Sequence, residues 1–352
     1  MPAVTTNIVI ALDAMGGDDA PAMVIDGIAL VVKRRPDVRF LLFGDEAKLR
    51  PLLAAWSGLR EAVEVRHTVD VVRASDKPSQ ALRQGRNSSM RLAINSVAAG
   101  EAAGVVSAGN TGALMAMSKF VLKTLPGIDR PAICSILPTI EGRSVMLDLG
   151  ANVVCDSDNL VQFAIMGAAF ARTVMELPRP RVALLNVGAE ELKGNDAVRT
   201  AAGVLKVAEL PMAFHGFVEG DDIAKGTVDV VVTDGFSGNV ALKAVEGTSK
   251  LFSAFLRSAF TSSLLARLGY LLARPAMARL RERIDPRLYN GGVLLGLNGI
   301  CVKSHGNTDA VGFANATILA VEMVADNLIG KINADMAHLV TVDMPQTRAV
   351  AS

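Results

Sequence analysis

The sequence predicts an α/β protein with a doubly wound, mostly parallel sheet, and three observations support this fold class. Six apolar, valine-rich runs occur along the 352 residues, each run ends in a short polar loop, and segments with helical spacing lie between the runs. Alternating strands and helices are typical of parallel sheets with right-handed crossovers, whose buried strands are apolar throughout. The runs cover 7–12, 103–106, 145–149, 181–187, 228–232 and 299–302.

The loops after these runs are rich in Gly, Asn, Ser, Thr and Asp. Because ligands of parallel sheets gather beyond the carboxyl ends of the strands, we expect the six loops to face one common cleft. Small residues leave backbone N–H groups accessible, and a following helix directs the positive end of its dipole at the loop. The loops therefore predict an anion site. They cover 13–18, 107–112, 150–152, 188–196, 233–239 and 303–309.

Helical spacing is clearest in the segments 87–99, 160–176, 197–209 and 239–259. No long linker rich in Pro, Ser or Gly divides the chain. We therefore expect one two-lobed catalytic unit over residues 1–330. Within this unit we expect amphipathic helices over residues 255–290. After it we expect a polar C-terminal tail over residues 331–352.

The composition argues against several classes of protein. A net charge of +1 and an aromatic content of 4% are unlike a nonspecific nucleic-acid binder. Cys134, Cys155 and Cys301 are widely spaced and the four histidines lack metal-ligand spacing, so we expect neither disulfides nor a metal, and a reducing cytoplasm fits. No apolar run reaches the roughly 18 residues of a membrane span, and the first run lacks the basic flank of a signal peptide.

The familiar nucleotide and hydrolase motifs are missing. Neither G-x-x-x-x-G-K-[ST] nor a G-x-G-x-x-G after the first strand occurs, which argues against a P-loop nucleotidase and weakens a dinucleotide site. The stretch GFSGN at 235–239 resembles a nucleophile elbow but ends in Asn instead of Gly. We therefore expect Ser237 to cap a helix or donate a hydrogen bond.

Two loops carry the clearest signs of close backbone approach. In the first, Gly16 and Gly17 follow Asp13, which fits either a general base or a helix cap. The loops at 107–112 and 233–238 share the pattern [ST]-x-G-x-[ST]-G. The shared pattern fits two similar anion cradles, and it fits two tight turns equally well.

Two side chains in other loops suit acyl or phosphoryl chemistry. Lys193, next to Gly194, supplies a compact positive charge for phosphate or a developing oxyanion, although a solvated lysine is the commoner case. His305 in the last loop can protonate a leaving group near neutral pH.

Two basic stretches lie outside these loops. Lys77, Arg83, Arg86 and Arg91 have a spacing that can share one helix face, and most such stretches are merely solvated. The second stretch combines a leucine stripe with arginines, and we expect Pro275 to break its helix in two. It suits a membrane surface or an oligomer interface equally, and an ordinary core-facing helix is the less favoured alternative. Its residues are Leu264, Leu265, Leu268, Leu271, Leu272, Arg267, Arg274, Arg279, Arg281 and Arg283.

Several of these segments together resemble the bacterial phosphate acyltransferases of phospholipid synthesis, the PlsX type. The match covers roughly residues 7–330, and its order and spacing make it specific. The matching blocks are IALDAMGGD (10–18), NSSM (87–90), SAGNTGA (107–113), DLGAN (148–152), KGN (193–195), TDGFSGNV (233–240), LLG (294–296) and HG (305–306).

The resemblance implies transfer of a long-chain acyl group from acyl carrier protein to inorganic phosphate, which gives acyl phosphate for a membrane-bound glycerol-3-phosphate acyltransferase. It implies an isocitrate-dehydrogenase-like fold related to phosphotransacetylases, a homodimer, and a cytoplasmic protein held peripherally at the inner face of the membrane. In that setting Lys77, Arg83, Arg86 and Arg91 would meet the acidic carrier protein. The helix with Leu264, Leu268, Leu271, Arg267 and Arg274 would lie at the dimer edge on lipid.

Phosphate is already a nucleophile, so its attack on a thioester requires no covalent acyl-enzyme and no cofactor. The site must position two anions and stabilise the tetrahedral oxyanion. We assign Lys193 to charge stabilisation, Asn239 to donation toward the oxyanion or phosphate, and Asp234 or His305 to the proton. The expected phosphate-binding residues are Asp13, Gly16, Gly17, Asn110, Thr111, Gly112, Asn152, Gly235 and Gly238.

Three other functions fit parts of the sequence. A phosphotransacetylase acting on a small acyl-CoA would use the same anion cleft. The leucine-arginine helix alone suggests a noncatalytic membrane-docking scaffold. A dehydrogenase is a distant third.

Overall fold

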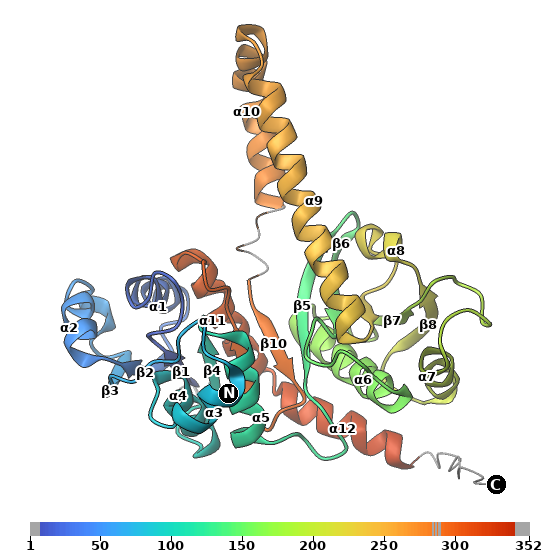
Figure 1. The fold of residues 1–352 in the computed structure, drawn as a ribbon, viewed down its shortest axis with the longest axis horizontal. Helices are drawn as coiled ribbons and strands as arrows, with labels where there is room; N and C mark the ends of the chain where they lie inside the picture. The colour runs from blue at the N-terminus through green and yellow to red at the C-terminus, as the bar shows by residue number, and fades with distance from the viewer. Residues whose placement is uncertain (1–7, 284, 286, 288–289, 342–352) are drawn as a thin grey trace, which may run out of the picture.

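Eleven strands form one sheet in the order β3-β2-β1-β4-β11-β10-β5-β6-β9-β7-β8 (Figure 1). The structure, a computed structural model, describes residues 8–341 except 284, 286, 288 and 289. The predicted class is confirmed, and a strand lies in each of the six predicted runs. The strands are β1 (Ile8–Asp13), β2 (Val38–Gly44), β3 (Val63–His67), β4 (Gly104–Ser107), β5 (Ala132–Thr139), β6 (Gly142–Leu147), β7 (Arg181–Leu185), β8 (Ala213–Val218), β9 (Val230–Val232), β10 (Gly292–Leu295) and β11 (Ile300–Lys303).

The four predicted helical segments correspond to α4, α6, α7 and α9. The helices are α1 (Ala22–Arg34), α2 (Glu46–Ala54), α3 (Pro78–Gln84), α4 (Ser89–Ala98), α5 (Thr111–Leu122), α6 (Ser157–Val174), α7 (Asp196–Val207), α8 (Gly220–Lys225), α9 (Gly235–Thr261), α10 (Leu264–Arg283), α11 (Ala310–Ala325) and α12 (Leu328–Thr341), with a short 3₁₀ turn at Ser57–Leu59.

Strand direction reverses in the middle of the sheet. The pairings β11–β10, β10–β5 and β5–β6 are antiparallel. As a result β1, β4 and β11 end at one edge of the sheet, whereas β6, β7 and β9 end at the opposite edge. The prediction that all six loops face one common cleft is therefore wrong. The reversal could not be predicted, because β10 is only four residues long and the apolar pattern of β5 is interrupted by Ser135 and Pro138.

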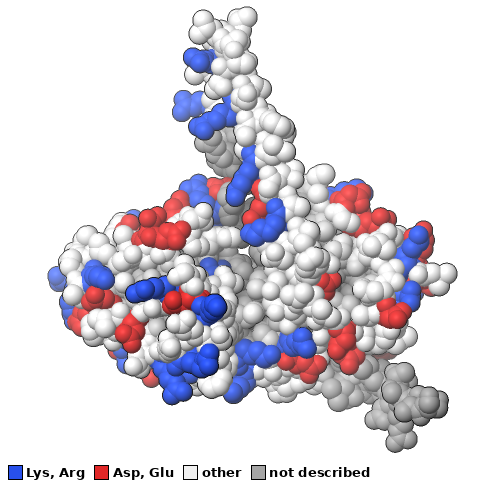
Figure 2. Space-filling model, in the orientation of Figure 1, with Lys and Arg blue, Asp and Glu red and all other residues white. Residues whose placement is uncertain are grey.

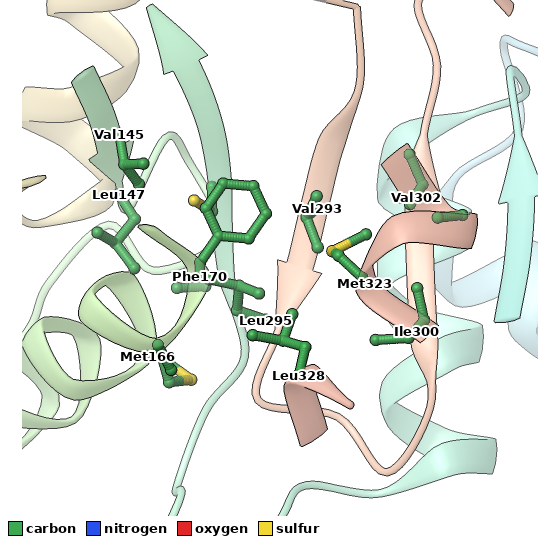
Figure 3. Packing of buried hydrophobic residues seen from close by; sticks show 14 of the residues in the cluster. Val145, Leu147, Met166, Phe170, Val293, Leu295, Ile300, Val302, Met323 and Leu328 are labelled. Carbon is green, nitrogen blue, oxygen red and sulfur yellow. The ribbon is translucent and has the colours of Figure 1, made fainter. Parts of the chain in front are cut away.

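One face of the sheet carries a continuous core that joins both halves of the molecule. The helices α1 and α11 cover the first half, while α6 and α12 cover the second. Figure 3 shows Phe170 of α6 and Met323 of α11 pointing toward Val293 on the central strand β10. The shared core therefore holds the two halves as one unit.

The opposite face is covered in two separate parts, which produces the two predicted lobes. The helices α4 and α5 pack over β1, β4 and β11, and α8 and α9 pack over β6, β7 and β9. Ile133 on β5 borders both clusters. Figure 1 shows β5 and β10 between α5 and α9, and Figure 2 shows the surface hollowed at the base of α9. The cleft thus runs over the central strands.

The second half of α9 and all of α10 form an arm that projects from the body (Figure 1). The predicted break at Pro275 is wrong, because α10 continues through it. On an exposed helix the carbonyl that proline leaves unpaired can turn to water. The leucine stripe is open to solvent, with Leu264 82% and Leu271 62% exposed.

The predicted polar tail from residue 331 is also corrected. The helix α12 continues to Thr341, and its residues Ile332 and Met336 are buried in the core. Asp335 on the same helix forms an ion pair with Arg172 of α6. The four-residue spacing of Leu328, Ile332 and Met336 marks the apolar face of this helix. Residues 342–352 of the predicted tail lie outside the described part of the chain.

No single helix within residues 8–341, as far as they are described, is long and apolar enough to cross a membrane. The bent pair α11 and α12 passes only as a combination, by length and composition.

Replacement of Gly238 by alanine tests the contact that seats α9 on the second half. A Cβ at this position would overlap the carbonyl oxygen of Asp148. We expect Gly238→Ala to lower the free energy of unfolding by about 1–3 kcal/mol, measured by urea denaturation. Gly247→Ala on the same helix meets nothing within 4 Å and should raise stability by up to about 1 kcal/mol. Equal stability of the Gly238→Ala variant and the unmodified protein would contradict the packing.

Candidate active site

The loops after β1, β4 and β11 form one compact group, which we call the first cluster: residues 13–18, 107–112 and 303–306. The amide of Asp18 donates to the carbonyl of Gly306 over 2.8 Å, and the amide of Ser304 donates to Ser107 over 2.9 Å. A Cβ at Gly16 would lie 2.7 Å from the amide nitrogen of Gly109. Glycine is therefore required where the loops touch.

Asp13 organises the first cluster from within. Its carboxylate accepts hydrogen bonds from the hydroxyls of Ser89 (2.6 Å) and Ser107 (2.7 Å), and it is 2% exposed. Burial raises the pKa of Asp13, against these hydroxyls, the Met15 amide and the charge of Lys303. The prediction that Asp13 contacts phosphate is not supported, because both of its oxygens are occupied inside the protein. Neither does it cap α1, which begins without a side-chain cap.

Lys303 is the charge that the sequence analysis missed. Its ammonium lies 3.3 Å from the carbonyl of Ala108, donates to the carbonyl of Ser304, and is attracted by Asp13 and Asp18. Burial nevertheless lowers the pKa of Lys303 to about 8. The available signal was a lysine directly after an apolar run, where a buried strand meets the anion loops.

His305 lies next to this lysine and faces α9 of the other half. Its amide donates to Asn290 over 3.0 Å. Partial burial and the charge of Lys303 lower the pKa of His305, Lys243 adds to the effect, and Glu246 opposes it. The imidazole is therefore neutral at pH 7 and ready to accept a proton. The two charged groups on α9 show that this helix lies within electrostatic reach of the first cluster.

The loop before α5 supplies accessible backbone amides. Asn110 caps the helix by accepting from Ala113, and its amide nitrogen donates to the carbonyls of Arg73, Ala74 and Asp76. Its side chain is therefore committed to structure. The amides of Thr111 and Gly112 belong to the first turn of the helix, where N–H groups have no intrahelical acceptors. They form the positive end of the helix and are free to bind an anion.

The loops at the opposite edge form a second cluster around Asp148, comprising residues 148–152, 193–195 and 233–239. Asp148 is fully buried and accepts from the amides of Ile133, Gly150, Ala151 and Asn152 over 2.6–3.2 Å. Burial raises its pKa, against these donors. Asp148 was not among the predicted site residues, although, like Asp13, it lies at the carboxyl end of a buried strand.

Three predicted phosphate ligands of the second cluster instead hold α9 against the Asp148 loop. Asn152 donates to Pro131 and Asp148, and it is 8% exposed. A Cβ at Gly235 would lie 2.6 Å from the carbonyl oxygen of Asn152, and Gly238 sits against the Asp148 backbone. The prediction of direct phosphate contact is therefore corrected for Asn152, Gly235 and Gly238, which serve close packing.

The two predicted catalytic residues at the start of α9 have different environments. Asp234 caps the helix, and its oxygens accept from the amide and the hydroxyl of Ser237 over 2.9 and 2.8 Å. Of the two roles predicted for Ser237, the structure shows hydrogen-bond donation, because the cap of the helix is Asp234. Asn239 donates to the carbonyl of Leu149 over 3.1 Å but remains exposed. Asn239, Lys243 and Glu246 share one face of α9 by their spacing, so this face leads from the second cluster toward His305.

Lys193 lies in the exposed loop between β7 and α7, at the opposite edge of the sheet from His305. Its neighbours Gly194 and Asn195 line an open pocket of about 670 Å³ together with Asp234 and Ser237. The structure thus places the Lys193 loop at the same pocket as Asp234 and does not bring Lys193 into the first cluster.

The predicted basic face is divided between two helices. Lys77 and Arg83 belong to the start and end of α3, Arg86 to the following turn, and Arg91 to α4. The prediction of one helix face is therefore wrong. Arg91 lies 5.3 Å from the ring centre of Phe120 on α5, and the same ring is 4.8 Å from the ammonium of Lys123.

The fold has known counterparts. The phosphotransacetylase from Streptococcus pyogenes superposes with a TM-score of 0.60 at 18% identity, covering 91% of this chain and 94% of that protein. At this identity the likeness shows the fold alone.

The sequence comparisons reach further. A family model described as "Fatty acid synthesis protein" matches residues 8–331. The phosphate acyltransferase of Rhodospirillum centenum is 62% identical over 330 residues, 94% of this chain and 93% of the relative. That of Rhodospirillum rubrum is 58% identical over 347 residues, 99% of both chains. The protein is thus an acyltransferase of lipid biosynthesis. It belongs to the phosphate acyltransferase family and transfers acyl groups to phosphate, which confirms the resemblance.

The charge of Lys303 gives a testable pH dependence. Because its pKa lies at about 8, the ammonium is lost as the pH rises through that value, and phosphate binding should weaken there. Arginine stays charged at these pH values, so Lys303→Arg should show a flatter rise of the phosphate KM between pH 7 and about 9. The comparison cancels the titration of phosphate itself. Parallel pH profiles of the two proteins would rule out Lys303 as the titrating group.

Proposed function

We propose that the protein transfers a long-chain fatty acyl group from acyl carrier protein to inorganic phosphate. The observation that carries this proposal is the first cluster, where the ammonium of Lys303 contacts Ala108 in the loop that leads into the N-terminal amides of α5, and Gly17 packs beside the same alanine. Backbone amides at a helix N-terminus together with one lysine suit a small, doubly charged anion. Membership of the family gives phosphate as the acyl acceptor. Acyl carrier protein as the acyl donor is part of our proposal.

The reaction needs no enzyme-linked intermediate. An oxygen of monohydrogen phosphate forms a bond to the thioester carbon, the bond from carbon to sulfur breaks, and the phosphate proton ends on the thiol. His305, neutral at pH 7, can take this proton and return it to the departing sulfur. Lys303 and the amides offset charge on phosphate and the oxyanion.

The cysteines do not favour a covalent route. Cys134 and Cys301 are buried, and burial raises the pKa of each thiol, to about 12 for Cys301. Cys155 is half-buried, and its pKa is raised to about 11. Thiols of this kind are poor nucleophiles at neutral pH.

Lys193 and Asn239 enter the proposal from the second cluster. Asn239 lies on the face of α9 that leads toward His305, and Lys193 lies in the exposed loop next to Gly194 and Asn195, which line the pocket with Asp234. We propose that they stabilise the thioester oxygen as it gains charge, which for Lys193 requires its exposed loop to move toward α9.

The basic surface of the first half suits the acidic carrier protein. Arg91 and Lys123 flank the exposed ring of Phe120, and partial burial together with the nearby charge of Arg86 lowers the pKa of Arg91. Figure 2 shows Lys and Arg side chains gathered near α3 and α5. Complementary charge accelerates the encounter of such partners. Phe120 lies nine residues from Thr111, about 14 Å along α5 from the amides at its start.

A donor assay tests the proposed function. The protein should form labelled acyl phosphate from labelled phosphate and palmitoyl carrier protein. Activity with acetyl-CoA alone would favour a phosphotransacetylase, to whose fold the chain is similar. Absence of phosphate-dependent thiol release with every donor would leave a noncatalytic docking role.

Lys193→Ala tests the oxyanion role. Loss of one such donor costs about 10²-fold or more in kcat, and we expect a loss of this size. Lys206→Ala is the matched control, because Lys206 pairs with Glu191 of the same loop and should leave kcat unchanged. Normal turnover by the Lys193→Ala variant would remove Lys193 from the mechanism.

We propose that the arm mediates peripheral attachment to the membrane and dimer formation. Its exposed leucines alternate with Arg267 and Arg274, a pattern suited to anionic lipid. Attachment at the inner face of the cell membrane would bring acyl phosphate to a membrane-bound glycerol-3-phosphate acyltransferase.

Liposome flotation of Leu268→Glu tests the attachment. Leu268 is 55% exposed, and a buried carboxylate in the lipid boundary is costly, so we expect less protein in the floating fraction. Ile140→Glu, 72% exposed on the body, should float like the unmodified protein. Equal flotation of all three proteins, with a lower molecular mass of Leu268→Glu by light scattering, would assign the arm to dimer formation alone.

A further inference from the structure

The open pocket of about 670 Å³ in the second half has walls unlike those of the first cluster. It lies between the loops that follow β6, β7 and β9, and the starts of α7 and α9 close its inner end. Its lining includes Val153, Val154, Val187, Val198 and Phe236. Pockets of this size and apolar character are typical of small-molecule sites.

The charge of the pocket argues against phosphate. None of its lining residues, all of which the structure describes, is Lys or Arg, and the carboxylate of Asp234 borders it. Asp234 caps α9 and so occupies the Ser237 amide at this helix start, and its carboxylate repels an anion but not a neutral apolar group. This pocket and the first cluster therefore suit different parts of one substrate.

Exposed apolar side chains surround the mouth of the pocket. Val154 and Val187 are each 77% exposed, and Phe236 is 62% exposed. A contiguous group of exposed apolar side chains on a protein surface usually marks a binding site. Something apolar therefore covers them during function.

The apolar surface continues along α9 toward the first cluster. Val240, 54% exposed, follows Phe236 by one turn, and Lys243 follows Val240 by another. Lys243 is within electrostatic reach of His305. The seven residues from Phe236 to Lys243 span about 10 Å. A long acyl chain bridges this distance, and a short one does not.

We propose that this pocket, with the Phe236–Val240 stripe, binds the fatty acyl chain of the substrate and sets the preference for chain length. The inference rests on the proposed function. The carbonyl end lies near His305, and the chain runs along α9 with its terminal carbons between Val154, Val187 and Phe236. Each methylene that the pocket buries strengthens binding by roughly fourfold.

The experiment compares two exposed valines on the same half. Val187→Asp puts a charge at the pocket, and Val207→Asp puts one at the last residue of α7, where the side chain is 71% exposed and does not line the pocket. For each protein, kcat/KM is measured with butanoyl, octanoyl and palmitoyl carrier protein. A fluorescent long-chain fatty acid measures binding independently of turnover.

We expect the unmodified protein and Val207→Asp to prefer palmitoyl over butanoyl donors and to bind the fatty acid. Val187→Asp should lose about tenfold or more in kcat/KM with palmitoyl donor and in fatty-acid affinity, with butanoyl turnover unchanged. Val154→Trp, which fills the pocket without a charge, should have the same selective effect.

Three results would overturn the pocket assignment while leaving the proposed function intact: equal losses with all chain lengths, unchanged chain-length profiles in both pocket variants, or a change only in oligomeric state by light scattering. Absence of turnover by the unmodified protein with every donor would instead refute the proposed function. The pocket would then be tested by fatty-acid affinity, and equal affinity of Val187→Asp and Val207→Asp would contradict it.

Discussion

Two buried carboxylates determine how the loops of this protein are held. A carboxylate without water is stable only when its oxygens accept several hydrogen bonds, so each one fixes the groups around it. Asp13 fixes the loops after β1 and β4 through Ser89 and Ser107. Asp148 fixes the turn after β6 through four backbone amides. The two ligand-facing regions depend on these internal contacts, although neither carboxylate is exposed to a ligand.

The reversal of strand direction gives these two regions separate chemistries. Because they lie at opposite edges of one sheet, the first can be cationic and rich in amides while the second is apolar and bordered by Asp234. The helix α9 connects them, since it starts at the second cluster and carries Lys243 and Glu246 past His305. A reaction between an anionic acceptor and a donor with a long apolar chain needs such an extended site.

Most of the architecture could be predicted from the sequence, because apolar runs and helical spacing report directly on burial. The position of the loops could not, since β5 and β10 are short or interrupted and only their pairing reveals the reversal. Residue types alone also do not tell whether a polar group faces a ligand or the protein. Asp13 and Asn152 were predicted to bind phosphate but form hydrogen bonds with buried groups of the protein. Lys303 could be recognised as a site residue only from its position near Asp13 and Asp18. The helix break predicted at Pro275 does not occur because an exposed helix can leave one carbonyl to water, whereas the boundary of α12 was missed because its apolar face is buried in the core.

The core shared by α1, α6, α11 and α12 has a consequence for motion. Domains joined by a linker can open as rigid bodies, but here any widening of the cleft must bend the sheet itself and disturb close packing around Phe170 and Met323. A change in the spacing of the two lobes therefore requires the sheet and this core to deform together. Heating should then melt both lobes in one cooperative transition.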